Sequence, residues 1–213
     1  MSLVELKVTE FINKVDSNEP APGGGSVSAL CASLGASLTR MAGHLTVPKK
    51  AFKAFDEDIQ KQVFESLEQL EIYKNELVQL IDKDTDAFNE IMKAFKLPKS
   101  TDEEKVVRRK AIQDATELAI EVPYQVAING LKALEECDLF IKYGNQNCLS
   151  DVAVGALMLE AGIEGALLNV LINLGMFKDE EKVAFYHTEI DRIKKEAIEL
   201  RVNYLDIVTN ALM

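Results

Sequence analysis

The sequence has no tryptophan, and aromatic residues make up only 7% of its 213 positions. Its core must therefore consist mainly of Leu, Ile, Val and Ala, a composition that suits helices better than a β-sandwich. Strand-like alternation, internal repeats and low-complexity linkers are also missing. The length fits one domain with a sizeable core. We therefore expect a single all-α domain over residues 1–213, folded as a bundle of long helices.

Cysteine and histidine are too few and too scattered for a disulfide framework or a metal site. Cys31, Cys137 and Cys148 form an odd number without close spacing, which suits a reducing cytoplasm. With only His44 and His187 beside them, no stretch has zinc-ligand spacing. The first residues lack the basic start and apolar stretch of a signal peptide. We expect a cytoplasmic protein that holds no metal.

Positive charge is also in short supply. Lys and Arg number 24 against 35 Asp and Glu, which gives a net charge of -11. Such a surface repels phosphate backbones, and the absence of a dense basic patch argues against nucleic-acid binding. An anionic ligand would need a local site made from a helix N-terminus and a few Lys or Arg. The most apolar segment, Val152 to Leu174, contains two Glu and two Asn, so we expect a core helix there and no membrane span.

Turn residues and capping signals divide the chain into helices. Ser26 or Ser28 is the expected cap of the second helix. Overlapping capping boxes begin at Ser100, and Pro123 should kink or restart the helix that follows. Ser150 and Asp179 should cap the last two helices. The expected helices are Thr9 to Ser17, Ser26 to Leu45, Ala51 to Phe95 (one helix, or two with little break), Ser100 to Phe140, Asp151 to Leu174, and Asp179 to the C-terminus.

The second of these helices is dense in small residues between Ala29 and Gly43. Small side chains at helical spacing let backbones approach closely, at a helix crossing or at a subunit contact. This helix and the apolar helix Val152 to Leu174 offer more close-packing surface than one short bundle needs. We therefore expect a homodimer.

One carboxylate falls where the helix pattern demands an apolar residue. Between residues 51 and 95, apolar residues recur at alternating steps of three and four, the seam of a coiled-coil-like bundle, and Asp84 occupies a position in that seam. Asp82 and Asp86 fall on the opposite, wetter face. A buried carboxylate must be partnered, protonated or functional. Asp84 is therefore a paired structural group, a sign that the seam opens to solvent there, or a catalytic group.

Two further groups of residues suit a ligand. The run Pro22-Gly23-Gly24-Gly25-Ser26 stands at a helix start, where glycines allow close backbone approach and the N-terminus favours negative charge. It is neither a Walker A loop nor a dinucleotide fingerprint, and a tight interhelical turn explains it equally well. Asn169 and Asn173 lie one helical turn apart. Their amides suit the edge of a heterocycle, although interhelical hydrogen bonding is the simpler explanation.

A series of motifs between about Thr9 and Leu174 occurs in the order found in a known family. The stretches are Pro20 to Ser26, Asp82 to Phe88, Lys96 to Lys99, Val122-Pro123, Gly144-Asn145, Ser150-Asp151 and Asn169 to Leu174. Together they resemble the cyclodeaminase domain of formiminotransferase-cyclodeaminase and its free-standing bacterial relatives, some described as methenyltetrahydrofolate cyclohydrolases. The glycine run alone would be a weak signal, but the whole series in order is specific.

The resemblance implies an all-helical homodimer that converts 5-formimidoyltetrahydrofolate to 5,10-methenyltetrahydrofolate with release of ammonia. The proposed catalytic aspartate of the family falls on Asp84, which would act as general acid and base. Tetrahydrofolate is then the substrate carrier, and no separate cofactor is implied. The pterin and the one-carbon unit would be held by residues to which the resemblance assigns no individual roles: Gly23, Gly24, Gly25, Ser26, Asn145, Asp151 and Asn173.

Lys49 and Lys50 coincide with a basic pair in relatives and would meet the glutamate tail of the folate, which can be a polyglutamate. As ordinary solvated lysines they are explained equally well. The sequence shows no formimidoyltransferase segment, so we expect that the chain does not make its own substrate. Two alternatives stay open: a methenyltetrahydrofolate cyclohydrolase, in which water attacks the methenyl carbon, and a non-catalytic helical dimerisation scaffold. The sequence does not separate histidine breakdown from formimidoylglycine use.

Overall fold

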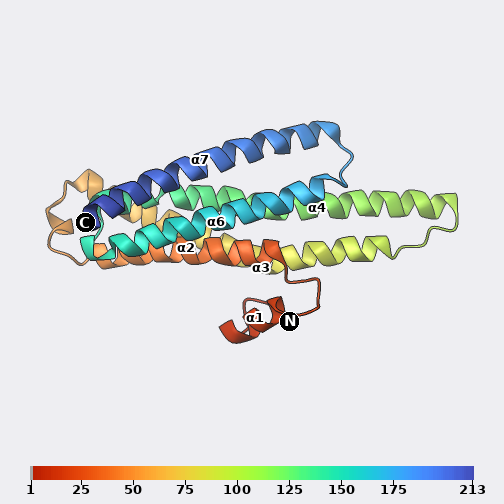
Figure 1. The fold of residues 1–213 in the computed structure, drawn as a ribbon, viewed down its shortest axis with the longest axis horizontal. Coiled ribbons are helices and arrows are strands. Elements are labelled where there is room, and N and C mark those ends of the chain that lie inside the picture. The colour runs from red at the N-terminus through yellow and green to blue at the C-terminus, as the bar shows by residue number, and fades with distance from the viewer. Residues whose placement is uncertain (1) are drawn as a thin grey trace.

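The computed structural model describes residues 2–213 as helices joined by short turns, with no strand in that range. The prediction of an all-α fold is confirmed. Long helices lie side by side along the long axis of the molecule (Figure 1). The helices are α1 (Val8–Val15), α2 (Gly24–Thr46), α3 (Glu57–Phe95), α4 (Asp102–Glu135), α5 (Cys137–Tyr143), α6 (Leu149–Leu174) and α7 (Glu180–Leu212), with short 3-10 turns η1 (Phe52–Ala54) and η2 (Gln146–Cys148).

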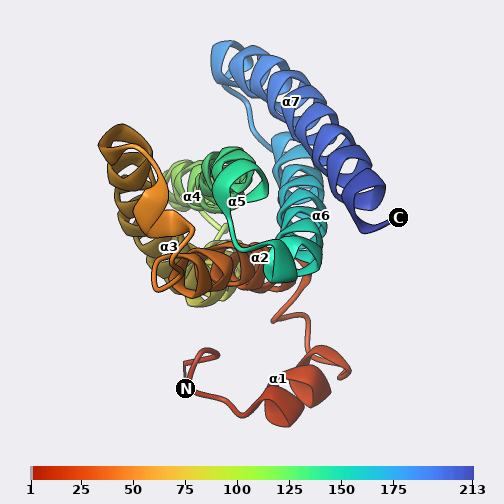
Figure 2. The same cartoon turned by 90° about the vertical axis from the view of Figure 1, so that its left-hand side faces the viewer.

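The end view separates the bundle from its first helix. In Figure 2, α2, α3, α4 and α6 surround a common core, α7 packs on the outside of α6, and α1 stands apart from the bundle beyond α2. Figure 1 shows the same separation of α1 from the long helices. The N-terminal segment contacts the rest of the chain through Ser2 and Leu3, which bond Asp82, and through the buried Phe11 of α1.

The small residues of α2 form a close crossing with α6 inside the protomer. Ala32 and Ala36 are fully buried, and a Cβ added at Gly35 would lie 2.7 Å from the carbonyl oxygen of Gly155. A Cβ added at Gly162 would lie 2.8 Å from the Cβ of Ala32. The close packing predicted for these residues is thus satisfied within one chain, and a subunit contact would have to use other surfaces.

The seam of α3 follows the predicted steps of three and four as far as Ile91, but Phe95, its predicted last position, is exposed and Ala94 is buried in its place. Val63, Leu70 and Leu77 are fully buried, and Ile81 is nearly so. The helix begins at Glu57, later than predicted, because the preceding residues turn to bury Phe52, whose ring meets the edges of Phe55 and Phe64. The long helix therefore has a separate 3-10 turn at its start.

The predicted restart of the helix at Pro123 is wrong, since α4 continues through this proline to Glu135, and the alternative of a kink stays a prediction. A proline removes the N–H that would bond the carbonyl four residues earlier, which here belongs to Ala119. The side-chain amide of Asn173 on α6 donates to that carbonyl at 2.8 Å. A neighbouring helix thus supplies the hydrogen bond that the proline cannot make.

The capping predictions are partly confirmed. The Thr101 side chain accepts from the amide of Glu104 in a capping box, and Asp179 accepts from the amide of Lys182 at the start of α7. The prediction for Ser150 is wrong, because α6 begins at Leu149 and no side chain caps it.

The segment Gln146–Leu174 is long and apolar enough to cross a membrane by length and composition alone. In the fold, α6 packs against α2, α4 and α7, as the sequence predicted for a core helix. Its two glutamates both pair with α7, Glu160 with Arg201 at 3.8 Å and Glu164 with Lys194. The apolar character of α6 therefore matches its central place in the bundle.

Candidate functional site

Asp84 lies at the N-terminus of α2 and acts as its cap. The backbone N–H of Ser26 donates to Oδ2 of Asp84 at 2.8 Å, and the Ser26 hydroxyl lies 3.1 Å from the same oxygen. Because α2 begins at Gly24, this N–H is one of the first-turn donors that a helix leaves unpaired. The prediction that Ser26 or Ser28 would cap the helix is wrong: Ser28 bonds the carbonyl of Gly24, and the capping carboxylate comes from α3.

The second carboxylate oxygen of Asp84 is left free by Gly25. A Cβ at Gly25 would overlap Oδ1, so this close approach of α2 to α3 requires a glycine. Among residues 2–213, no group donates a hydrogen bond to Oδ1. One oxygen of Asp84 is therefore held and the other is available for chemistry.

The environment of Asp84 favours proton exchange. Burial raises the pKa of this carboxyl, while the hydrogen bonds from the side chain and backbone of Ser26 lower it, and the net direction is upward. A carboxyl whose pKa is moved toward neutrality can both take up and return a proton. Asp84 is thus a paired carboxylate, as one of the predicted alternatives has it, and its catalytic role stays a prediction.

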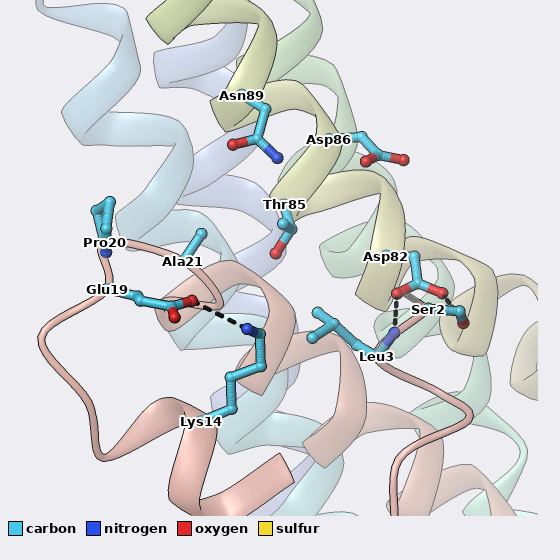
Figure 3. Close-up of a pocket in the computed structure, with 10 residues that line it drawn as sticks. All are labelled: Ser2, Leu3, Lys14, Glu19, Pro20, Ala21, Asp82, Thr85, Asp86 and Asn89. Carbon is cyan, nitrogen blue, oxygen red and sulfur yellow. Dashed lines mark hydrogen bonds and ion pairs between the residues drawn. The ribbon is translucent and has the colours of Figure 1, made fainter. Parts of the chain in front are cut away.

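A hollow of about 500 Å³ lies beside the site, between the N-terminal segment and α3 (Figure 3). The figure shows Thr85 and Asn89 of α3 opposite the loop from Glu19 to Ala21. The Thr85 hydroxyl lies 3.2 Å from that of Ser26, which connects this hollow to the Asp84 carboxyl. Sequence reasoning missed Thr85, and its only signal was its place next to Asp84.

Asp82 is more than a solvated residue on the wet face of α3. Its carboxylate accepts from the Ser2 hydroxyl at 2.6 Å and from the Leu3 amide, and it thereby ties the N-terminal segment to the bundle (Figure 3). Asp86 is exposed, as predicted. The two flanking aspartates therefore differ, and only Asp86 is free of a structural contact of this kind.

The two asparagines of α6 have different surroundings. Asn169 lies next to the exposed Gly24, where an added Cβ would be 3.1 Å from its amide nitrogen. Asn173 donates to the carbonyls of Ala119 and Asn169, at 2.8 and 2.9 Å. The simpler explanation of interhelical hydrogen bonding therefore accounts for Asn173, and Asn169 is the amide nearer the glycine run.

The remaining predicted site residues lie at the opposite end of α2. Lys49, Lys50 and Asn145 line a separate hollow of about 390 Å³, and Asp151 lies in the first turn of α6. The 23 residues of α2 separate this end from Asp84 by about 34 Å. Within one protomer, the structure does not bring these four residues together with Asp84.

The described part of the chain, residues 2–213, contains no group of three or more His, Cys, Asp or Glu side chains that could hold a metal ion. Its three cysteines are free thiols, and burial raises the pKa of Cys31 and, to about 12, that of Cys137. The Asp84 carboxyl, the glycine run and nearby hydroxyls are thus the chemical groups that the site offers.

Comparison with known proteins shows which family this chain resembles. The family model described as formiminotransferase-cyclodeaminase matches residues 7–192. Formimidoyltransferase-cyclodeaminase of Gallus gallus is 39% identical over 195 residues, which are 92% of this chain and 35% of that protein. Methenyltetrahydrofolate cyclohydrolase of Methylorubrum extorquens is 36% identical over 166 residues, 78% of each chain. The crystal structure of formiminotetrahydrofolate cyclodeaminase from Thermotoga maritima matches with a TM-score of 0.85 and 26% identity over 98% of both chains.

The matched residues make up only part of the formimidoyltransferase-cyclodeaminases. This chain spans 35% of the length of the Gallus gallus protein and 36% of that of the Mus musculus formimidoyltransferase-cyclodeaminase, which is 34% identical to it.

Proposed function

Because this chain belongs to the formiminotransferase-cyclodeaminase family, we propose that it converts 5-formimidoyltetrahydrofolate to 5,10-methenyltetrahydrofolate and releases ammonia. The names of the Gallus gallus and Thermotoga maritima proteins support this activity. The observation that carries the proposal is the Asp84 carboxyl, which is held through Oδ2 and free at Oδ1 beside the glycine run.

The proposed reaction needs one group that takes a proton and returns it. N10 of the folate attacks the formimidoyl carbon of the protonated amidine, a bond forms between N10 and that carbon, and Asp84 accepts the N10 proton. Asp84 then protonates the amino group on the same carbon. The carbon–nitrogen bond breaks, ammonia leaves, and the methenyl cation forms. The regenerated carboxylate stabilises this positive charge.

The substrate would bind at the exposed start of α2. Gly23 and Gly24 present backbone without side chains there, and the Asn169 amide lies beside Gly24. Ser26 is fully buried and would not contact the substrate directly. Asn145 and Asp151 lie too far from Asp84 in the same protomer to share this role.

A methenyltetrahydrofolate cyclohydrolase is the second candidate, and a named relative supports it. The Methylorubrum extorquens cyclohydrolase is 36% identical to this chain over 166 residues. In that reaction Asp84 would take a proton from the water that attacks the methenyl carbon.

An ammonia assay on the purified chain separates these activities. A cyclodeaminase releases one ammonia for each 5,10-methenyltetrahydrofolate formed from 5-formimidoyltetrahydrofolate. Hydrolysis of added 5,10-methenyltetrahydrofolate without ammonia release from the formimidoyl compound would favour the cyclohydrolase. Absence of both activities, together with absence of folate binding in a titration, would favour a scaffold.

A homodimer is part of the proposal, and exposed apolar residues of α2 support it. Val27, Leu34, Met41 and Leu45 follow one another at steps of seven, seven and four, so they form one stripe on the outer face of the helix. The segment Gly24–Thr46 contains no Asp or Glu. In a chain of net charge -11, this face escapes the self-repulsion that opposes association of two copies.

A two-fold axis that crosses this stripe would also give Lys49 and Lys50 a role. The two α2 helices would then run antiparallel, and the lysines of one protomer would lie beside the Asp84 end of its partner. Within one protomer the separation of about 34 Å is too long for a folate with a single glutamate. We therefore propose the glutamate tail, and a polyglutamate above all, as the ligand of these lysines across the dimer.

A further inference from the structure

The Ser26 hydroxyl is buried among three oxygen atoms. Ser26 has no exposed surface. Its Oγ lies 2.8 Å from the carbonyl oxygen of Ile81, 3.1 Å from Oδ2 of Asp84 and 3.2 Å from Oγ1 of Thr85. A serine hydroxyl has one proton to donate and two lone pairs that accept. Ser26 therefore has more acceptors within reach than it can serve at one time.

This arrangement suits both protonation states of Asp84. When the carboxyl is ionised, the Ser26 hydroxyl can donate to Oδ2, beside the N–H of Ser26 that donates to the same oxygen. When Asp84 carries the proton on Oδ1, the oxygen left open by Gly25, Oδ2 is still an acceptor, and the Ser26 hydroxyl can either keep donating to it or turn to the Ile81 carbonyl. No heavy atom has to move between the two states.

The elements around the carboxyl place few charges near it. From α2 it faces Gly25 and Ser26, which are uncharged, and from α6 the nearest side chain beside the glycine run is the amide of Asn169. Burial raises the pKa of Asp84 and the two hydrogen bonds from Ser26 lower it, and no charged neighbour contributes to the shift. The titratable groups along α3 and the adjacent hollow are Asp82, Lys83, Asp86, Lys14 and Glu19.

We propose that Ser26 is a positioning residue for Asp84. The Ser26 hydroxyl stabilises the Asp84 carboxyl in both the ionised and the protonated state that the reaction passes through. The inference rests on the proposed function, and it reassigns Ser26 from substrate binding to the support of the acid–base group. Ser26 acts on the reaction only through Asp84.

The test compares Ser26→Ala with Ser28→Ala. Ser28 lies two residues further along the same helix and is also buried. Its hydroxyl donates to the Gly24 carbonyl and to no carboxylate. Loss of a donor to the ionised form raises the pKa of a carboxyl. In Ser26→Ala we therefore expect the acidic limb of kcat/KM for ammonia release to move to higher pH. We expect kcat to fall about 10- to 100-fold, the worth of a hydrogen bond to a charged group, with KM near the wild-type value.

A second readout does not depend on activity. In protein labelled with 13C at the aspartate carboxyls, the Asp84 signal, assigned from Asp84→Asn, should titrate at higher pH in Ser26→Ala and at the wild-type pH in Ser28→Ala. Ser26→Cys keeps a weaker donor, so its Asp84 signal should titrate at a pH between those of the wild type and Ser26→Ala. This variant replaces Ser26→Ala in the test if Ser26→Ala does not fold.

Two results would overturn the proposal. One is an Asp84 titration that is the same in the wild type and the Ser26 variants. The other is a Ser26→Ala enzyme with altered KM and an unchanged pH profile, which would make Ser26 a substrate ligand. If the wild type releases no ammonia, the proposed function fails, while the carboxyl titration still decides whether Ser26 governs Asp84.

Discussion

The two oxygens of Asp84 have different surroundings, and the role proposed for the residue rests on this difference. Oδ2 is bonded to the first turn of α2, while Oδ1 faces the space that Gly25 leaves open. Asn keeps an acceptor for the Ser26 amide but cannot carry a proton. We therefore expect Asp84→Asn to fold normally and to lose about two to four orders of magnitude in kcat for ammonia release. Folate binding, measured by titration calorimetry, should largely survive.

The control for this substitution is Asp86→Asn, because Asp86 is exposed on the same helix. Asp82→Asn is less suitable, since Asp82 holds Ser2 and Leu3. Near-normal ammonia release by Asp84→Asn, together with loss of activity in Asp86→Asn, would contradict the assignment.

The Asp84→Asn variant also reports on the raised pKa of Asp84. Below the ordinary carboxyl pKa of about 3.9, the folded and unfolded states both hold the proton and the group has no effect on stability. As the pH rises from there to the raised folded-state pKa, the unfolded state releases its proton first, so the wild type loses stability. Asp84→Asn lacks this loss. Its stability advantage in urea unfolding should therefore grow over that pH interval and then stay constant.

At the scale of the element, the effect of replacing a glycine at the start of α2 depends on which glycine is changed. A Cβ at Gly25 would overlap Asp84, whereas a Cβ at Gly23 would lie 3.7 Å from the nearest atom, in an extended backbone that any residue adopts. Gly25→Ala should displace the carboxyl and reduce kcat about 100-fold or more. Gly23→Ala should keep its fold and its kcat, and any loss should appear in KM, because Gly23 lies at the proposed substrate surface. Equal kcat values for the two variants would show that the approach of Gly25 to Asp84 is unimportant.

The link between α4 and α6 makes a second prediction for the elements. Asn173→Ala would leave the Ala119 carbonyl without the bond that replaces the one missing at Pro123, and should lower the free energy of unfolding by about 1–3 kcal/mol. With Pro123→Ala the helix can make its own bond to Ala119, so Asn173→Ala should then cost less. A double-mutant cycle in urea measures this coupling, and strict additivity would refute it.

At the scale of the whole molecule, the uncharged outer stripe of α2 predicts self-association. Leu34→Glu would bury an unpaired charge in a contact made by this stripe, so light scattering should show a monomer where the wild type is a dimer. Val106→Glu, at an exposed apolar residue of α4, is the matched control and should leave the dimer intact. A monomeric wild type would remove the proposed interface.

The lysine pair gives the second prediction at this scale. Replacement of Lys49 and Lys50 by Ala should raise KM for a polyglutamylated substrate more than for the monoglutamate, and less so at high salt. In the monomeric Leu34→Glu background this difference should disappear, because the lysines then lie about 34 Å from Asp84. Equal effects on both substrates would exclude the lysines as a tail site.

The sequence by itself determined the properties that depend on local periodicity and composition. The helices, the seam of α3, the caps at Thr101 and Asp179 and the anomaly at Asp84 all follow from side-chain spacing along one helix. Such spacing is a property of neighbouring residues, so it can be read without knowing what packs against them. The family resemblance was also visible, because its motifs lie in order along the chain.

Tertiary structure decided how distant segments complete one another. Asp84 caps α2 across 58 positions of sequence, and Asn173 replaces the hydrogen bond that Pro123 lacks across 54. No local pattern shows which carboxylate or amide will reach an unpaired backbone group, because the partner is chosen by the packing of helices against each other. The same packing separated Lys49, Lys50, Asn145 and Asp151 from Asp84, since α2 holds the two groups at its opposite ends.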